Sequence, residues 1–480
     1  MPKKSMTLNL VMNGIKTLMT VLFPLITFPY ASRVLGTAGI GKVEYASAII
    51  SYFALLASLG ISTYAVREGA GIQEDKEKFN KFVKEILHIN LFTTFTAYIA
   101  LIVFLNLPIL QDYRMLLMIF GIDLLFTTVS MAWLFIIKEE YAYITKRSIF
   151  FQFFSLILLF LLVRNREDYN WYAALWVISS GGAAILNLWH SRKFVDWKAK
   201  HTYEYRKHLK PILLIFGTTL AATINTSIDK TMLGAMLGDS VVGIYTAAVK
   251  LNLAISILMG TISATILPRV SYYVGNGLKR EYEKLMKSSV DILLMISIPT
   301  VVGMICTSDI LILLFSGKSF LSGTMAANIL SVRVVIEAVN KIIAYQVCIP
   351  YKKDKEVLFS TTVGAVSNFV ANLVLIPIVG VTGAATATLL SEIIMFFILM
   401  RYARDIIKLG VMFGRMPSYI MASIWFFVVR WGVNASVQGT FLRLFITVSI
   451  CVCGYFAILL LIKDPYLQEY KTRIFNRIKR

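Results

Sequence analysis

The segment "IDKTMLGAMLGDSVVGIYTAAVKL" (residues 228–251) places three ionisable residues, Asp229, Lys230 and Lys250, in a strongly apolar stretch of chain. An ionisable side chain costs roughly 3 kcal/mol or more at the centre of a membrane helix, so it needs a partner, a water-filled cavity or a function. Which of these applies depends on where each residue lies relative to the lipid. The apolar segments on either side decide that position, because they predict where the chain crosses the membrane.

The composition is that of a membrane protein. Of the 480 residues, 57% are hydrophobic and 16% are charged, whereas soluble domains carry about 25% charged residues. Apolar runs recur along the chain, and each approaches the roughly 20 residues that a helix needs to cross the hydrocarbon core. The runs are continuous rather than alternating, which predicts helices and not a β-barrel. The N-terminal "MPKKSMTLNL" enters a full span without a small-residue cleavage site, so no cleavable signal peptide is expected.

Fourteen spans are predicted from these runs. They cover approximately residues 8–32, 41–66, 86–107, 114–137, 147–163, 170–190, 211–236, 241–267, 288–312, 323–349, 357–378, 380–400, 416–433 and 442–462. Their connections alternate between basic segments, such as "SRKFVDWKAKHTYEYRKHLK", and short links, such as "NASVQGT". Cytoplasmic loops are enriched in Lys and Arg, so both termini and the basic connections are expected to face the cytoplasm. The net charge of +21 is then largely a topology signal, and no nucleic-acid partner is expected.

An internal repeat is predicted from the opening segment. "RVLGTAGIGKVEYASAI" (33–49) is similar to "TMLGAMLGDSVVGIYTAAV" (231–249), because in both Leu-Gly closes a span, a short turn follows, and Tyr precedes small residues. Spans 1–6 and 7–12 also share their number and orientation, as in transporters built from repeats. We therefore predict an all-α integral membrane protein in four parts. These are an N-terminal six-helix lobe (1–190), a basic cytoplasmic linker (191–210), a C-terminal six-helix lobe (211–407), and two additional helices with a basic cytoplasmic tail (408–480).

Ionisable residues occupy corresponding spans of the two predicted halves. Asp123 on the fourth span and Arg333 on the tenth both fall near mid-membrane. Lys42 and Glu44 on the second span correspond to Lys250 on the eighth. Such charges would converge if the two halves faced each other across a cavity.

A structural interpretation competes with this one. Arg333, Glu337 and Lys341 are spaced four residues apart, so they can neutralise one another along one helix face. Glu44 and Asp229 also have cations close to them in the sequence, on their own span or at the end of a neighbouring one. The sequence leaves open whether each charge is paired for stability or used for function.

Several segments resemble one known family. "PYASRVLGTAGIG" and "YFALLASLGISTYAVREGA" are similar to the beginning of bacterial flippases for O-antigen and capsule polysaccharides. The similarity continues through "IDKTMLGAMLGDSVVGIYTAAVKL", "ILPRVS" and "NLVLIPIVGVTGAATATLLSE", and it covers nearly the whole chain. It implies the fold of the multidrug/oligosaccharidyl-lipid/polysaccharide exporter superfamily, in which two pseudo-symmetric six-helix lobes enclose a central cavity. The last two spans are similar to the two helices that follow the lobes in lipid II flippases.

The same resemblance implies a substrate and a site. The family flips an oligosaccharide repeat unit, joined through diphosphate to a polyprenyl lipid, from the cytoplasmic to the outer leaflet of the bacterial inner membrane for cell-surface polysaccharide synthesis. Candidate contacts for the diphosphate or for acidic sugars are the cations Arg33, Lys230, Lys250 and Arg333. Charge support or ion coupling is expected from Lys42, Glu44, Asp123, Asp229, Glu337, Lys341 and Glu392. No catalytic residue, metal or cofactor is expected; H⁺ and Na⁺ are the candidate coupling ions, and a polysaccharide polymerase and export machinery are candidate partners.

Other functions stay open beside this one. A flippase for lipid II or another lipid-linked precursor would have the same expected fold and cannot be separated by sequence. An ion-coupled drug exporter of the superfamily would favour an acidic or aromatic cavity, and the excess of Lys and Arg within the spans argues against it. An enzyme is not expected, because the longest connections have only about twenty residues and leave no room for a catalytic domain. The chain has no Walker A sequence, so ATP hydrolysis within it is excluded as the driving force.

Overall fold

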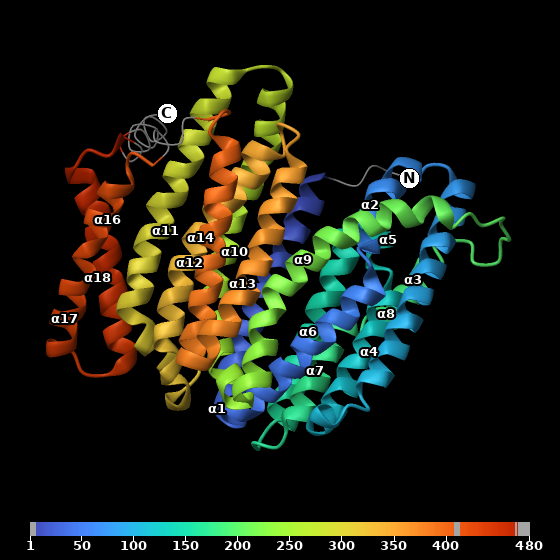
Figure 1. Ribbon diagram of the computed structural model, residues 1–480, viewed down its shortest axis with the longest axis horizontal. Coiled ribbons are helices and arrows are strands. Elements are labelled where there is room, and N and C mark those ends of the chain that lie inside the picture. The colour runs from blue at the N-terminus through green and yellow to red at the C-terminus, as the bar shows by residue number, and fades with distance from the viewer. Residues whose placement is uncertain (1–5, 408–412, 466–467, 469–480) are drawn as a thin grey trace. The chain divides into compact units, whose positions relative to one another are not determined.

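The chain is built from helices. The computed structural model describes residues 6–407, 413–465 and 468, and no strand occurs in these ranges. Residues 1–5 and the basic tail 471–480, both predicted to be cytoplasmic, lie outside the described residues. Figure 1 shows long helices running beside one another within each part of the chain. The predicted all-α class is confirmed for the part of the chain described.

Thirteen helical segments in the described chain are long and apolar enough to cross a membrane. The first, Val11–Ile72, has 62 residues, which at 1.5 Å per residue is about three times the hydrocarbon thickness of ~30 Å. Its main helix α1 (Met6–Ser58) is broken at Gly36, whose φ of 68° and ψ of −173° are not helical. The break lies between the predicted spans 8–32 and 41–66, so this segment accounts for two crossings. The chain is therefore a multi-pass membrane protein with about the expected fourteen spans.

One compact unit comprises residues 1–246. It contains α1, α2 (Ile61–Ile72), α3 (Lys76–Phe104), the 3-10 turn η1 (Pro108–Tyr113), α4 (Arg114–Ser130), α5 (Ala132–Ile137), α6 (Tyr141–Leu162), α7 (Tyr169–Gly181), α8 (Ala184–Ser191), α9 (Arg206–Leu237) and the beginning of α10. α1 packs against α3, α4, α6, α7 and α9, and α7 also packs against α4 and α6. An apolar cluster that includes Phe79, Phe82, Trp133 and Val195 joins α3, α5 and the segment after α8.

The second compact unit comprises residues 247–480, with the same undescribed gaps after residue 407. It contains the rest of α10 (Asp239–Gly275), α11 (Lys279–Phe315), the 3-10 turn η2 (Lys318–Gly323), α12 (Thr324–Ile342), the π-helical turn η3 (Ile343–Cys348), α13 (Asp354–Val379), α14 (Val381–Ala403), α16 (Met416–Ile424), α17 (Phe426–Ser436) and α18 (Thr440–Leu461). α14 packs against α12 and α13, and α12 packs against α11. The predicted lobes 1–190 and 211–407, and a cavity between them, stay predictions.

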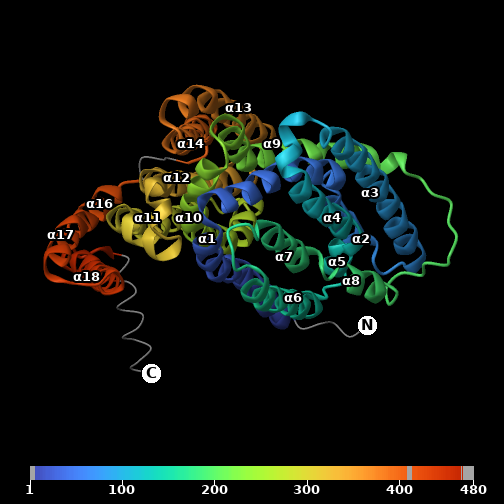
Figure 2. The same ribbon diagram turned by 90° about the horizontal axis from the view of Figure 1, so that it is seen from below.

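The last helices are held on α11. Figures 1 and 2 show α16, α17 and α18 beside α11, and α16 and α18 both pack against it. The buried Tyr455 donates its hydroxyl hydrogen to the Met295 carbonyl oxygen at 2.8 Å. Arg415 forms an ion pair of 3.4 Å with Asp291 on α11. This ion pair and this hydrogen bond anchor the additional helices on α11.

Several helices begin earlier than hydropathy predicts. α6 begins at Tyr141 rather than at 147, α9 begins at Arg206 within the expected linker 191–210, and α11 begins at Lys279 rather than at 288. In α9 and α11 these additional turns are rich in charged residues, chiefly Lys and Arg, which lower hydropathy but form helices well. In α6 they have the sequence "YAYITK", with one Lys. Part of what the sequence predicts as basic loop is therefore the polar end of a helix.

Candidate functional site

A polar seam joins the second half of α1 to α9 within the first unit. It consists of three side-chain pairs: Glu44 with Lys230 at 2.6 Å, Ser51 with Ser227 at 2.9 Å, and Tyr52 with Thr231 at 3.1 Å. All three pairs join residues 44–52 of α1 to residues 227–231 of α9. Lipid cannot replace hydrogen bonds between spans, so the seam fixes how these two helices pack.

The ion pair of Glu44 and Lys230 is the most deeply placed part of this seam. The Glu44 side chain is 1% exposed and that of Lys230 is 21% exposed. The sequence suggested partners for Glu44 nearby, but the ion pair spans 186 residues. Lys42 instead lies over the Tyr169 ring, 5.3 Å from its centroid. Arg33 is exposed and donates to the Pro29 carbonyl oxygen at 2.6 Å.

Two further carboxylates hold the beginning of α10. Asp229, which is 4% exposed, accepts a hydrogen bond of 2.5 Å from the Tyr245 hydroxyl. Asp239, the first residue of α10, accepts one of 2.6 Å from the Tyr113 hydroxyl on η1. The sequence suggested a neighbouring Lys for Asp229, and neither tyrosine was singled out. Phenol donors satisfy these carboxylates without adding a positive charge.

Two glycines bring α1 and α10 into backbone contact. A Cβ atom on Gly41 would lie 1.7 Å from the Asp239 carbonyl oxygen, and one on Gly243 would lie 2.0 Å from the Thr37 carbonyl oxygen. Each glycine therefore faces the backbone of the other helix, and the contact is close to symmetric. Only a residue without a side chain fits either position.

In the second unit, α12 carries a ladder of charges. Glu337 accepts from both Arg333 and Lys341, the latter at 2.6 Å. The side chains of Arg333, Glu337 and Lys341 are 25%, 17% and 41% exposed, respectively. The predicted i,i+4 ladder is confirmed, and it places two cations on one carboxylate. Lys250 lies half-buried on α10.

Two other carboxylates sit in the spans next to neutral donors. Glu392 on α14 is 5% exposed, and its carboxylate accepts a hydrogen bond of 2.8 Å from the side-chain amide of Asn340. Asn340 follows Glu337 by three residues, so Glu392 approaches a face adjacent to the ladder. Asp123 on α4 accepts a hydrogen bond of 2.8 Å from the Ser180 hydroxyl, and it forms no ion pair with any described residue. Within the described ranges, no group of His, Cys, Asp and Glu could hold a metal ion.

Arg147 is a cation with buried side-chain atoms that the sequence did not single out. The Nε and Nη1 atoms of Arg147 on α6 are buried and have no hydrogen-bond partner among the described residues. The Tyr143 ring lies 5.8 Å from the guanidinium carbon. Arg147 is the first residue of the predicted span 147–163, whereas α6 begins at Tyr141, so the residue was expected at a span end and not within a helix. Its spacing of four residues from Tyr143 is the signal that would have placed it on a helix face.

Comparison with known proteins gives one family match and distant relatives. The polysaccharide biosynthesis protein family matches residues 7–274, more than half of the chain. A Haloferax volcanii protein named as a low-salt glycan biosynthesis flippase, Agl15, is 25% identical over 252 residues, which are 51% of this chain and 52% of that protein. An Escherichia coli (strain K12) protein named as an O-antigen transporter is 23% identical over 398 residues, which are 80% of this chain and 93% of that protein. The chain thus spans about half of the first relative and nearly all of the second.

The fold is similar to a solved structure. "Lipid II flippase MurJ, inward closed conformation" superimposes with a TM-score of 0.75 at 14% identity, covering 95% of this chain and 100% of that one. A likeness at this identity shows the fold alone, and it extends over both units of the chain.

Proposed function

The chain belongs to the polysaccharide biosynthesis protein family, and we propose that it flips polyprenyl-diphosphate-linked oligosaccharide repeat units across the membrane by alternating access. It is a membrane transporter rather than an enzyme, as its family and its relatives are. The names of the two relatives, a glycan flippase and an O-antigen transporter, support a lipid-linked glycan as cargo. We place the protein in a bacterial inner membrane with both termini cytoplasmic, and a polysaccharide polymerase and export machinery would receive its product.

The chemistry of such a cargo sets what the protein must provide. A sugar head group with a diphosphate cannot enter hydrocarbon without losing its hydrogen bonds to water. Cations in the membrane replace part of that hydration, and an Arg side chain can grip a phosphate through two parallel hydrogen bonds. The polyprenyl tail stays in lipid throughout.

The observation that carries the proposal is the ladder on α12. Two cations, Arg333 and Lys341, share the single carboxylate of Glu337, so the three residues carry a net positive charge in a membrane span. Both cations remain partly exposed, at 25% and 41% of their side chains. A group of three residues that carries net positive charge and has partly exposed cations fits an anionic ligand better than a role in stability alone. Arg33 and Lys250 are the other candidate contacts.

Glu392 gives this ladder a means of ion coupling. Its carboxylate approaches the same helix through Asn340. When Glu392 is ionised, it offsets the remaining positive charge of the ladder, and when it is protonated, that charge is available to a phosphate. We therefore propose that H⁺ is the coupling ion and that its binding at Glu392 raises the affinity for the diphosphate. Asp123 is the mid-membrane carboxylate of the first unit to test for the same role.

Reconstituted flipping tests the proposal. Purified protein in liposomes is given a labelled polyprenyl-diphosphate oligosaccharide, and the rate at which the label reaches the opposite leaflet is measured. Arg333→Ala and Lys250→Ala should each slow flipping about tenfold or more, because a charge-assisted hydrogen bond is lost. Lys284→Ala, which removes an exposed cation at the start of α11, should match wild type at equal folded abundance.

The same assay separates the alternatives. Full activity in both Arg333→Ala and Lys250→Ala would show that these cations are structural. Transport of lipid II at the same rate as the oligosaccharide would make the protein a general precursor flippase. Glu392→Gln, which imitates the protonated carboxyl, should flip at a rate independent of an imposed pH gradient, and retained dependence would remove Glu392 from the coupling step.

A further inference from the structure

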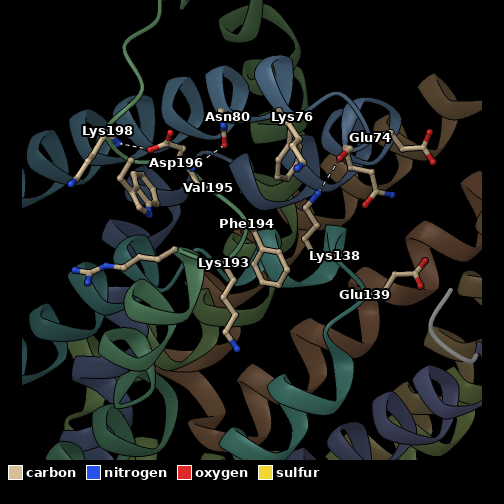
Figure 3. A pocket seen from close by; sticks show the side chains of 14 residues that line it. Glu74, Lys76, Asn80, Lys138, Glu139, Lys193, Phe194, Val195, Asp196 and Lys198 are labelled. Carbon is tan, nitrogen blue, oxygen red and sulfur yellow. Dashed lines mark hydrogen bonds between the residues drawn. The ribbon is translucent and has the colours of Figure 1, made fainter. Parts of the chain in front are cut away.

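A cavity of about 1160 Å³ opens in the first unit (Figure 3). Its wall comes from three short segments: residues between 73 and 80, residues 138–139, and residues 192–198. The volume lies above the roughly 300–1,000 Å³ of sites for small molecules. The cavity is therefore large enough for a molecular head group and not only for a single ion.

The cavity lies at the ends of membrane spans. The candidate spans Val11–Ile72, Pro108–Ile137 and Tyr169–Ser191 end immediately before its three wall segments, and the span Lys76–Phe104 begins within the first. All four helices thus reach the membrane surface around the cavity, at the depth of lipid head groups. On α8, which leads into the third wall segment, Ile185 and Trp189 are 70% and 67% exposed. An apolar surface that suits lipid chains therefore runs up to the cavity.

The wall carries more positive than negative charge. Its cations are Lys76, Lys138, Arg192, Lys193 and Lys198, and its carboxylates are Glu74, Glu139 and Asp196. Asp196 is engaged within the wall, where it accepts from the Lys198 backbone N–H at 2.9 Å. In the view of Figure 3, Lys193 and Lys198 lie away from Glu74 and Glu139. Arg192, Lys193 and Lys198 form no ion pair with any residue in the described ranges.

The segment that bears these three cations is fixed by its own contacts. The Asp196 backbone N–H donates to the Asn80 side-chain oxygen at 3.1 Å, and the Trp197 indole N–H donates to the Ser191 hydroxyl at 3.2 Å. Val195 is 3% exposed and belongs to the apolar cluster under the cavity. The cations are therefore presented from a held backbone, so little ordering entropy is lost when a ligand binds.

Lys138 closes the opposite wall. Its ammonium lies 3.8 Å from the centroid of the Phe79 ring and donates to the Gln73 carbonyl oxygen at 3.1 Å. These contacts join the ends of α2 and α5 to the beginning of α3. They keep a positive charge at the cavity in a fixed position.

We propose that this cavity binds the phosphate-bearing head group of an anionic phospholipid from the surrounding leaflet, with Arg192, Lys193 and Lys198 around the phosphate. Clusters of basic residues directly at the ends of spans attract anionic lipids. The exposed face of α8 accommodates the acyl chains. Lipid is favoured over a soluble protein partner because the wall is made from span ends and adjoins an apolar, lipid-facing helix. The inference is independent of what the protein transports.

Lipid binding to the full-length protein tests the proposal. Detergent-purified protein is titrated with phosphatidylglycerol or phosphatidylcholine, and bound lipid is counted by native mass spectrometry. The triple variant Arg192→Gln, Lys193→Gln, Lys198→Gln should bind phosphatidylglycerol about tenfold more weakly or worse. The matched control Lys279→Gln, Arg280→Gln, Lys284→Gln removes three exposed cations from the start of α11 and should bind as wild type does. Replacing the three cavity residues by the alternative cation, Lys for Arg and Arg for Lys, should restore binding.

Each other outcome overturns the proposal. Equal losses in the cavity and control variants would mean that net charge alone attracts the lipid, and equal binding of phosphatidylcholine would mean that any lipid adheres. Competition by inorganic phosphate or glycerol phosphate at the concentration of the lipid would indicate a soluble phosphate ester as ligand. Displacement of lipid by an acidic peptide would make the cavity a protein-docking surface. The thermal midpoint in detergent without lipid must agree between the variants and wild type, and a lipid-dependent rise in the midpoint should be lost in the cavity variant alone.

Discussion

Replacing Gly41 by Ala tests the contact between the two helix ends in the first unit. The new Cβ would lie 1.7 Å from the Asp239 carbonyl oxygen, 2.5 Å from its carbonyl carbon and 3.0 Å from the Gly243 nitrogen. Cβ atoms do not approach other heavy atoms within 3.0 Å, so the two backbones must separate by more than an ångström. Because every obstructing atom is backbone, no side-chain rotation relieves the contact.

The expected magnitude is a balance of two effects. Overpacking costs about 1–3 kcal/mol, and a clash with backbone on a second helix belongs at the upper end. Ala in place of Gly inside a helix returns about 1 kcal/mol. Gly41→Ala should therefore lower the free energy of unfolding by about 2 kcal/mol. Gly14→Ala on the same helix is the matched control, because nothing lies within 4 Å of its Cβ position. Its free energy of unfolding should rise by about 1 kcal/mol.

Equilibrium unfolding in detergent micelles, followed by circular dichroism, measures both variants. Gly243→Ala should behave like Gly41→Ala, since its Cβ would lie 2.0 Å from the Thr37 carbonyl oxygen. The double variant should cost less than the two single costs together, because the first substitution already separates the helices. If Gly41→Ala were as stable as Gly14→Ala, or if the two contact variants were simply additive, α1 and α10 would not be in contact as described.

Three further outcomes are expected. Lys230→Met removes the cation paired with the Glu44 carboxylate, whose side chain is 1% exposed, and should lower the free energy of unfolding by about 3 kcal/mol. Adding Glu44→Gln should restore most of that stability. A double variant as unstable as Lys230→Met would contradict the pairing. Asp123→Asn should abolish any dependence of flipping in liposomes on an H⁺ or Na⁺ gradient, whereas Ser180→Ala, which removes only the donor to Asp123, should keep it; unchanged gradient dependence in Asp123→Asn rejects that carboxylate. Two backbone N–H groups in its loop hold the pKa of Asp168 below its usual 3.8, so its contribution to stability is complete above that pH and is lost as the pH falls through the lower folded value. Thermal midpoints from about pH 6 to about pH 2 should accordingly fall less steeply in Asp168→Asn than in wild type, and parallel curves would show that this loop does not contribute.

Interactions within one helix could be predicted from the sequence, and those between helices could not. Spacing alone predicted the ladder of Arg333, Glu337 and Lys341, because residues four apart meet on a helix whatever surrounds it. The same local reasoning failed for Glu44, whose partner Lys230 is brought to it only by the packing of α1 on α9. Hydropathy likewise predicted the spans and the all-α class, but it placed the start of α11 too late, because the first turns of that helix are charged and still helical.

The repeat shows the same limit at the level of backbone conformation. The opening segment contains two Leu-Gly pairs, and the sequence similarity was built on the first, which ends at Gly234. The structure breaks the chain at Gly36 and at Gly238, whose φ values are 68° and 86°. Gly234 is instead inside α9, where a Cβ would lie 2.1 Å from the Tyr45 ring. Both glycines are required, one for its positive φ and the other for close packing, and residue identity alone does not distinguish these two needs.

Charge balance, more than burial, separates the ionisable residues by role. The Glu44–Lys230 pair is neutral and its carboxylate is inaccessible. Pairing therefore offsets the cost of placing these two charges in a membrane span, and no ligand is required. Asp229 and Asp239 are satisfied by phenol donors and hold α10 in place. The ladder on α12 differs, because its two cations share one carboxylate and both stay partly accessible. Accessible cations in a span are suited to an anionic ligand, and for a transporter of anionic amphiphiles the cargo is the natural counterion. By this reasoning, loss of Lys230 should lower the stability of the protein, whereas loss of Arg333 should lower the rate of transport.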